Sequence, residues 1–346
     1  MKTLAAILVE NHQHLIVDEI GINNSLTEGQ VLVQIEKSGI CGAQINEIDA
    51  VKGKDIFLPH LLGHEGIGKV LEIGKSVTNI KIGDRVVLHW RPGIGIQSET
   101  YKYSWMNKVL NSGWVTTFSE LTVVSENRLT PIPKTVISEH LPLLGCGLTT
   151  VFGSLENEVS IKLGDSVLIL GIGAVGSLAL IASKLKGAGK ISAVDKNQNK
   201  LELAKACGAD FFDMVSTSNL KGLTYGGSIG NEFYDLIIDT TGDSELISKS
   251  FEMLTKSGTL LIIGVMPHTQ KLSINSLGLN LGKKILGTQG GSSKPQIDIP
   301  KLVLAIEKNI LNLDVLPYRK RSLEQINTSI QEIRDGLPLK QYITMN

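Results

Sequence analysis

The chain has 346 residues, 42% of them hydrophobic and 20% charged, and its 34 lysine and arginine residues balance its 34 aspartate and glutamate residues. This composition is typical of one large or two ordinary globular domains with a full apolar core. The balanced charge argues against nucleic acid or an anionic membrane as a partner. No apolar run approaches the ~20 residues that a membrane-spanning helix needs.

The N-terminal region and the cysteines indicate the compartment. The apolar run Leu4–Val9 has six residues, which is too short for a signal peptide and predicts a first strand. Cys41, Cys146 and Cys207 are too few and too scattered for a disulfide framework. We therefore expect a cytoplasmic protein in a reducing environment.

The first ~130 residues are rich in β-branched residues and glycine turns. The runs QVLVQIEKSGI at 30–40, GIGKVLEIGKSV at 66–77 and FSELTVVS at 118–125 predict strands of a β-rich, barrel-like domain. From about Leu141 the pattern changes to strands that alternate with helices, which favours a parallel, buried sheet.

The C-terminal part changes pattern again near Lys283. It contains two amphipathic stretches, 299–311 and 323–336, and a last short strand at 341–345. We predict a discontinuous catalytic domain made of residues 1–150 and 290–346. A dinucleotide-binding domain of residues 151–289 is inserted into it, and we expect the cofactor and substrate between the two.

A glycine-rich turn is the most informative motif. Gly171, Gly173 and Gly176 form G-x-G-x-x-G between the apolar run VLIL and a helical stretch. The turn would aim amide groups and the helix dipole at a pyrophosphate. Asp195 ends the next apolar run and would accept hydrogen bonds from a ribose, which favours NAD over NADP. The residues expected to contact the cofactor here are Gly171, Gly173, Ala174, Val175, Gly176 and Asp195.

Three short segments carry metal-ligand types: Cys41 in GICGAQ, His64 and Glu65 in GHEG, and Cys146 in LLGCGLTT. Two thiolates and one imidazole suit a catalytic zinc with an open position. Judged on cysteine and histidine counts alone, two buried cysteines and a capping histidine are the favoured interpretation.

The whole pattern resembles the zinc-dependent alcohol dehydrogenases of the medium-chain dehydrogenase/reductase superfamily. The resemblance rests on the turn at 39–42, GHEGIGKVLEIGKSV at 63–77, KIGDRVV at 81–87, LLGCGLTTVFG and the nucleotide motif, in the family's order. LLGCGLTT and TTFSE are most similar to the glutathione-dependent formaldehyde dehydrogenase and classical alcohol dehydrogenase branch. The implied fold is α/β, a GroES-like catalytic domain plus a doubly wound Rossmann sheet.

The resemblance implies a role for each matching residue. Cys41, His64 and Cys146 would bind the zinc, and Glu65 would sit behind it or exchange with its water. The implied cofactor contacts are Thr150 at the nicotinamide, Asp195 and Lys200 at the ribose, Ile263 and Val265 at the carboxamide, and Lys340 at the pyrophosphate. A lysine supplies the charge of the family's usual arginine but not its bidentate fork, so a solvated surface lysine is an equal alternative.

The chain departs from the family at three places. The segment at 88–114 lacks the four cysteines of the structural zinc, so we expect one catalytic zinc per chain and no structural zinc. Ala43 and Asn46 replace the usual hydroxyl and histidine of the proton relay. Gln44 replaces the aspartate that orients the zinc histidine, and an amide does not raise that histidine's basicity as a carboxylate does.

The cysteine-free segment is a candidate source of substrate specificity. Trp90 aligns with a wall of the family's substrate pocket, beside Ala43 and Asn46. Further polar and aromatic candidates are His89, Arg91, Tyr101, Lys102, Tyr103, Trp105, Lys108 and Trp114. They suit a hydroxylated or anionic substrate such as a polyol, sugar or cyclitol derivative. The alternative is a loop that covers the barrel or forms a subunit contact.

The main hypothesis is a zinc-dependent oxidoreductase that transfers a hydride between NAD(H) and a small alcohol or carbonyl compound. The alternatives are an enzyme with retained NAD, such as an epimerase, and a catalytically silent NAD-binding protein. The run from GTLLIIG to KKILGTQGG resembles the segment through which the family dimerises, so we expect a homodimer or homotetramer.

Overall fold

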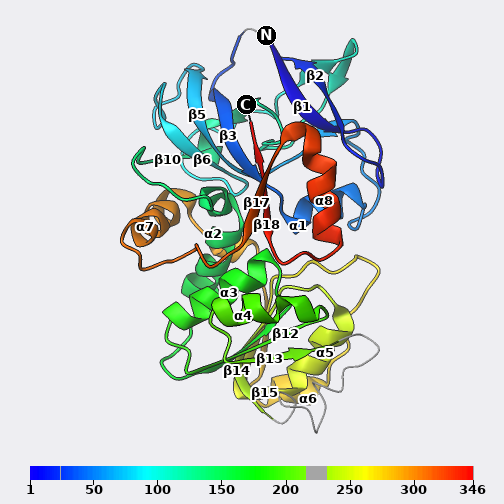
Figure 1. Ribbon diagram of the computed structural model, residues 1–346, viewed down its shortest axis with the longest axis vertical. Coiled ribbons are helices and arrows are strands. Elements are labelled where there is room, and N and C mark those ends of the chain that lie inside the picture. Colours follow the sequence, from blue (N-terminus) through cyan, green and yellow to red (C-terminus); the bar gives the residue numbers. More distant parts are fainter. Residues whose placement is uncertain (24, 216–231, 346) are drawn as a thin grey trace. The chain divides into compact units, whose positions relative to one another are not determined.

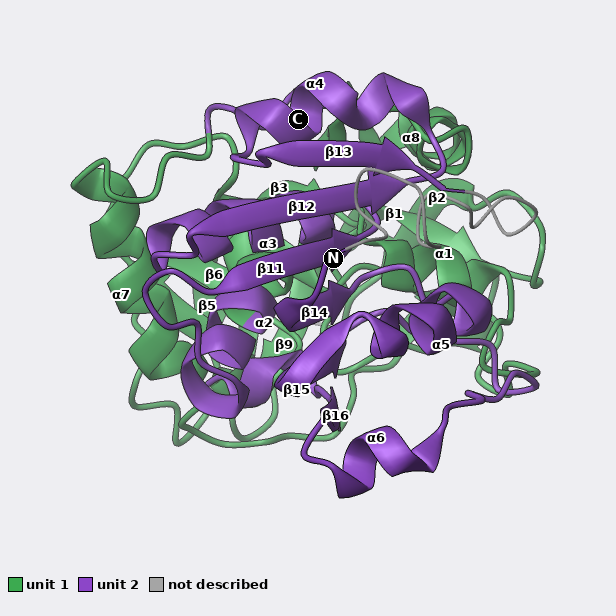
Figure 2. Ribbon diagram, turned by 90° about the horizontal axis from the view of Figure 1, so that it is seen from below, with its two compact units in different colours: residues 1–149, 294–313, 318–346 green, residues 150–293, 314–317 purple. Residues whose placement is uncertain are grey.

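The computed structural model describes residues 1–23, 25–215 and 232–345. The described chain divides into two compact units (Figure 2). The first contains residues 1–149, 294–313 and 318–346, and the second contains 150–293 and 314–317. The sequence-based domains ended at 150 and 289, and the short return of residues 314–317 to the second unit was not anticipated.

The first sheet of the first unit has five strands, of which β1 and β2 are labelled in Figure 1. Their order is β4 (His60–Leu61), β1 (Lys2–Leu8), β2 (Ile16–Gly21), β7 (Tyr103–Trp105) and β8 (Lys108–Leu110). After β8, the amide of Asn111 donates to Pro59 O, and Asn111 O accepts from the amide of Leu61. The sheet therefore closes on itself, which produces the barrel-like domain that the sequence predicted.

The second sheet of this unit contains the site-bearing strands. Its order is β10 (Leu129–Ile132), β6 (Arg85–His89), β5 (Glu65–Ile73), β3 (Gln30–Gly39), β18 (Lys340–Thr344) and β17 (Tyr318–Ser322), with β9 (Leu121–Ser125) also paired to β3. The C-terminal strand β18 is thus hydrogen-bonded to the N-terminal strand β3.

The helices of the first unit are α1 (Gly42–Ile48), α7 (Pro295–Glu307) and α8 (Ile326–Arg334). Ile326 and Ile330 of α8 pack with Ile48 of α1 and Ile343 of β18 in one apolar cluster. The C-terminal segment therefore completes the core of the N-terminal domain. The helix α2 (Gly147–Gly153) runs across the division between the units.

The second unit is a six-stranded parallel sheet. Its order is β13 (Phe211–Met214), β12 (Lys190–Asp195), β11 (Ser166–Leu170), β14 (Tyr234–Asp239), β15 (Leu254–Ile262) and β16 (Lys284–Gly287). Counted along the chain this is the order 3-2-1-4-5-6 of a Rossmann fold, which confirms the predicted α/β class. Its helices are α3 (Ala174–Leu185), α4 (Leu201–Ala206), α5 (Ser244–Glu252) and α6 (Ser276–Asn280).

Burial on both faces explains the continuous apolar strands of this unit. Leu168, Leu170 and Ile237 are fully buried, and Ile247 and Phe251 of α5 pack in the same cluster. Among the described residues, no helix combines the length and apolar character needed to cross a bilayer.

Candidate metal and cofactor sites

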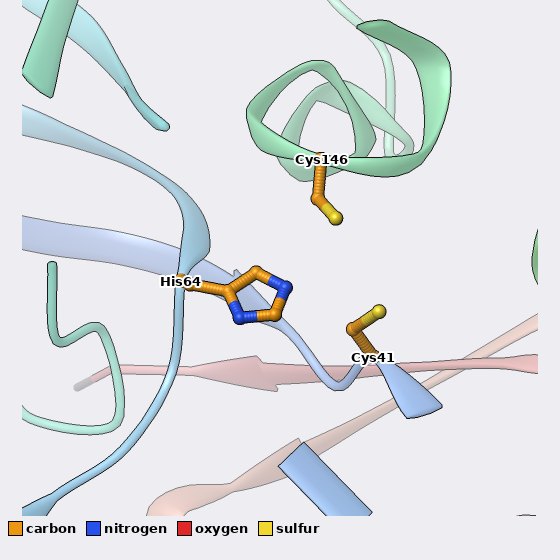
Figure 3. Close-up of side chains that lie close together, drawn as sticks. All are labelled: Cys41, His64 and Cys146. Carbon is orange, nitrogen blue, oxygen red and sulfur yellow. The ribbon is translucent and has the colours of Figure 1, made fainter. Parts of the chain in front are cut away.

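Three separate segments of the first unit bring three ligand-type side chains together. Cys41 directly precedes α1, His64 directly precedes β5, and Cys146 lies between the turn Leu141–Gly145 and α2. One donor atom from each lies within 4.8 Å of the others. Figure 3 shows the two sulfur atoms and one ring nitrogen converging.

Gly145 allows Cys146 to reach this cluster. A Cβ atom at position 145 would lie 2.3 Å from Leu88 O and 2.9 Å from Glu65 Cα. Only glycine permits the backbone before Cys146 to pack this closely on β5 and β6.

The side chain of Gln44 fixes the ring of His64. The Gln44 amide and His64 Nδ1 are hydrogen-bonded, and both His64 Nε2 and Gln44 Oε1 are buried without a partner. An amide turned so that Oε1 accepts from Nδ1–H satisfies this oxygen and leaves the Nε2 lone pair facing the thiols. Gln44 can therefore hold the tautomer that a metal requires, as an aspartate would, but without its charge.

The two thiols differ in their protonation. The hydrogen bond from Cys146, reinforced by His64, holds the pKa of Cys41 well below its usual range despite burial. The same hydrogen bond and burial raise the pKa of Cys146 well above its usual range. Two neighbouring thiolates repel each other, and a divalent cation would stabilise both.

A buried ion pair lies behind the cluster. Lys340 Nζ donates to Glu65 Oε1 at 2.5 Å and to Ile40 O at 2.8 Å, and both charged side chains are buried. Burial raises the pKa of Glu65 although Lys340 opposes this effect. Lys340 thus compensates a carboxylate of its own unit. Its predicted contact with the pyrophosphate stays a prediction.

The donor set fits zinc. Two thiols and a buried imidazole nitrogen without a hydrogen-bond partner face one another. Leaving such a nitrogen unsatisfied costs about 1–3 kcal/mol, which metal ligation would offset. Cys41, His64 and Cys146 are therefore three ligands of the type found in catalytic zinc sites that keep one open position.

The glycine turn has the geometry of a phosphate cradle. Gly171 has φ +87°, in the left-handed region that a tight turn after β11 requires. A Cβ at Gly176 would lie 1.8 Å from Gly171 O, so α3 can approach β11 only with glycine there. At Gly173, no atom of the described residues other than its chain neighbours lies within 4 Å of such a Cβ. That open backbone, beside Ala174 and Val175 at the start of α3, suits a dinucleotide pyrophosphate.

Asp195 lies at the carboxyl end of β12, as the sequence predicted. Its Oδ2 accepts from the Ile172 amide at 2.6 Å and from Lys200 Nζ at 3.4 Å, and its Oδ1 accepts from the Asn197 amide at 2.9 Å. The carboxylate is thereby fixed against the glycine turn. It retains lone pairs for ribose hydroxyls.

The other predicted cofactor residues lie in the second unit. Thr150 is buried on α2, and Ile263 and Val265 follow β15. The Ile263 amide donates to Asp239 O, so its carbonyl is the group that could serve a carboxamide. These contacts stay predictions.

The predicted substrate-pocket residues have three different environments. Ala43 and Asn46 are both half-buried on α1. Trp90 is also half-buried, and the Arg91 guanidinium lies 5.7 Å from the centre of its ring. The roles of all three residues in a substrate pocket stay predictions.

Most of the cysteine-free segment belongs to the fold. Tyr101 and Tyr103 are buried in an apolar cluster with β1, and Trp105 Nε1 donates to Asp18. His89 is buried, with Nδ1 2.7 Å from Arg91 O and Nε2 2.9 Å from Thr130 Oγ1. The interpretation of these aromatic residues as substrate-facing surfaces is therefore corrected, because this segment supplies the closing strands of the barrel.

Sequence reasoning missed two features. The Glu65–Lys340 pair joins residues 275 positions apart, so no local pattern reports it. A second group of ligand-type residues, Glu47, Asp55 and His60, has donor atoms within 4.8 Å of one another. Its spacing of eight and five residues matches no familiar motif.

Comparisons with known proteins agree with this geometry. Residues 27–134 match the alcohol dehydrogenase GroES-like domain, and residues 174–308 match the zinc-binding dehydrogenase domain. An alcohol dehydrogenase class-3 from Drosophila melanogaster is 30% identical, with 98% of this chain and 96% of the relative covered. The chain belongs to the zinc-dependent alcohol dehydrogenase family.

Two further relatives span the whole chain. An S-(hydroxymethyl)glutathione dehydrogenase from Synechocystis is 28% identical, covering 99% of this chain and 100% of the relative. The crystal structure of benzyl alcohol dehydrogenase from Acinetobacter calcoaceticus superposes with a TM-score of 0.88 at 26% identity, with both chains fully covered. The protein is an alcohol dehydrogenase-type oxidoreductase of the zinc-dependent class.

Proposed function

We propose that this protein is an NAD-linked dehydrogenase that interconverts a small alcohol and its carbonyl compound at one zinc held by Cys41, His64 and Cys146. The convergence of two thiols on a buried His64 Nε2 without a partner carries this proposal. The cysteine-free segment at 88–114 supports a single zinc per chain without a structural one.

The residues around the metal have separate tasks. A bound zinc would supply a Lewis acid that lowers the pKa of an alcohol or polarises a carbonyl. Gln44 holds the ring of His64. Glu65 and Lys340 place a compensated ion pair behind the ligands, which keeps the net charge near the metal low. Ala43 and Asn46 offer neither a hydroxyl nor an imidazole. These two positions therefore cannot transfer the proton of the alcohol.

The preference for NAD rests on Asp195. A bound NAD would accept the hydride from the carbinol carbon. The Asp195 carboxylate, fixed by Ile172 and Asn197, favours ribose hydroxyls and repels a 2′-phosphate. Gly173 leaves the backbone open to the pyrophosphate.

The missing relay favours a substrate that brings its own hydroxyl groups, such as a polyol, sugar or cyclitol derivative. A neighbouring substrate hydroxyl can carry the alcohol proton toward water. This proton path would replace the group that Ala43 lacks. We also propose a cytoplasmic location, in line with three cysteines that form no disulfide.

A homodimer is proposed through the free edge of the second unit. The strand β16 is last in the sheet order and pairs with β15. The adjacent segment exposes Leu277, Leu279 and Leu281. An edge strand flanked by exposed leucines suits pairing with a second copy of this chain.

The test is zinc content per chain, measured together with NAD⁺ reduction on simple alcohols, polyols and sugar derivatives. The wild-type protein should contain about one zinc and turn over a polyhydroxylated compound. Cys41→Ser should lose both zinc and turnover, whereas Cys207→Ser, which changes a buried thiol of the second unit, should keep both.

Three outcomes would contradict the proposal. Full turnover by Cys41→Ser would show that zinc takes no part in the reaction. NAD binding without zinc would favour the silent protein. Conversion of substrate without release of NADH would favour an epimerase.

A further inference from the structure

A second cluster of ligand-type side chains lies in the first unit. Glu47 is on α1, Asp55 lies in the connection that follows, and His60 begins β4. Their donor atoms lie within 4.8 Å of one another. The cluster shares no residue with Cys41, His64 and Cys146.

The ring of His60 presents one nitrogen to the two carboxylates. The side chain is 6% exposed, and Nδ1 lies 3.0 Å from Leu61 O, which can only accept a hydrogen bond. Nδ1 therefore carries a proton, and Nε2 is the atom that faces the cluster. Nε2 lies 2.6 Å from Asp55 Oδ2 and 3.9 Å from Glu47 Oε1.

Glu47, whose side chain is 45% exposed, reaches the cluster from its solvent side. A separation of 3.9 Å from His60 Nε2 is too long for a hydrogen bond. It is, however, a normal separation for two ligands of one cation, since bonds of ~2.1 Å place neighbouring ligands roughly 3–4 Å apart. His60 is the one partner within ion-pair distance of this carboxylate among the contacts of the described chain.

The charges around Glu47 favour a cation as well. Partial burial raises the pKa of Glu47, and the nearby carboxylate of Asp55 acts in the same direction. The positive groups that oppose this effect are His60, His64 and Lys52. The cluster of two carboxylates and one imidazole therefore has a net negative charge. A divalent cation would stabilise both carboxylates.

We propose that His60 Nε2, Asp55 and Glu47 bind a divalent cation that favours carboxylate oxygen, such as manganese. One imidazole and two carboxylates supply one nitrogen donor and several oxygen donors for such a cation. Binding requires an unprotonated Nε2, and Asp55 moves back from the ring to a ligand–ligand distance of about 3 Å.

The bound cation would hold together the segment 47–60, since its three ligands come from α1, the following connection and β4. One turn before Glu47, α1 carries Gln44, which contacts His64. The second site thus stabilises the helix that positions the first. It does not depend on the proposed dehydrogenase reaction.

The experiment is equilibrium dialysis of the zinc-loaded protein against Mn²⁺, which prefers carboxylate and imidazole over thiolate. Bound manganese and zinc are counted per chain by elemental analysis. The wild-type protein should bind about one Mn²⁺ while its Cys-ligated zinc is retained. Asp55→Asn and Glu47→Gln should each weaken the Mn²⁺ affinity about tenfold or more.

Asp49→Asn is the matched control. It removes the same charge from the same segment, but its carboxylate pairs with Arg334 at 2.5 Å and lies outside the cluster. Its Mn²⁺ affinity should equal that of the wild type, and circular dichroism shows whether each variant is folded. Absence of Mn²⁺ binding to the wild type would overturn the proposal, as would equal affinity in Asp55→Asn, Glu47→Gln and Asp49→Asn.

Discussion

At the scale of single residues, Asp195 has a structural role and, in the proposed function, a selective one. Its carboxylate holds the amides of Ile172 and Asn197, which connects the end of β12 to the glycine turn. The same charge would meet the 2′-phosphate of NADP. Under the proposed function, selectivity between the two cofactors would therefore depend on the charge of this side chain more than on its size.

Asp195→Asn tests this role. The amide keeps the size and one acceptor, but it no longer repels a phosphate. We expect the ratio of kcat/KM for NAD over NADP to fall about tenfold, which corresponds to about 1.4 kcal/mol. The control is Asp213→Asn on the neighbouring strand β13. An unchanged ratio in Asp195→Asn would show that this carboxylate does not determine the preference for NAD.

At the scale of elements, Glu126 anchors the cysteine-free segment. Its Oε1 accepts from the amides of Thr78 and Asn79 at 2.7 Å, and its Oε2 accepts from the Ile96 amide at 2.9 Å. The side chain is buried. A single carboxylate thus connects two loops of the first unit.

Glu126→Ala should lower the free energy of unfolding by about 3 kcal/mol, because three amide donors lose their acceptor. Urea denaturation measures this change. Glu99→Ala alters an exposed glutamate of the same segment and should have little effect. Equal denaturation midpoints for the two variants would show that Glu126 does not anchor the segment.

The ion pair between Arg321 of β17 and Glu332 of α8 should be sensitive to acid. Arg321 donates to both carboxylate oxygens of Glu332, at 2.7 and 2.9 Å, and this pairing lowers the pKa of Glu332 to about 2. The group is ionised in the folded state down to that pH. Its stabilisation is therefore complete above the ordinary glutamate pKa of 4.5 and is lost as the pH falls toward 2.

Glu332→Gln should remove this pH dependence. The side chain of Glu332 is 17% exposed, so solvent screening reduces the effect to about 1–2 kcal/mol. Thermal unfolding of wild type and variant should differ most at pH 6 and converge near pH 2. A constant difference across this range would exclude the ion pair as its source. Glu307→Gln on the exposed face of α7 is the control.

At the scale of the whole molecule, the proposed dimer makes a measurable prediction. Leu277→Glu with Leu281→Glu places two charges on side chains that are 58% and 68% exposed beside β16. Light scattering should give a dimer for the wild type and a monomer for this variant. Leu163→Glu, at a 93% exposed leucine of the same unit, should remain dimeric. A monomeric wild type would contradict the proposal.

The sequence predicted what is encoded locally. The apolar strand VLIL, the glycine turn and Asp195 have a fixed spacing within one βαβ unit, and the structure has them as β11, α3 and β12. The hairpin of β7 and β8 was missed because Met106 and Asn107 turn with positive φ values of 48° and 60°. That turn usually carries Asn-Gly or Asp-Gly.

The candidate site was only partly predictable, because its residues are far apart in the sequence. Cys41, His64 and Cys146 meet through strands that pair across long separations, so the family pattern identified them and their spacing did not. The strand β17 has the sequence YRKRS, without apolar alternation. Its pairing with β18 and the contact of Arg321 with Glu332 stabilise it instead.

The pairing of β18 with β3 has a consequence for biosynthesis. The parallel sheet of residues 150–293 can be completed while later residues are still inside the ribosome. The unit that holds Cys41, His64 and Cys146 cannot be completed this early. Until Lys340–Thr344 has emerged, β3 lacks its partner strand β18 and Glu65 lacks the ammonium group of Lys340. A chain that ends just before residue 340 therefore has every strand of the parallel sheet but lacks one strand of the sheet that carries the ligand-type residues.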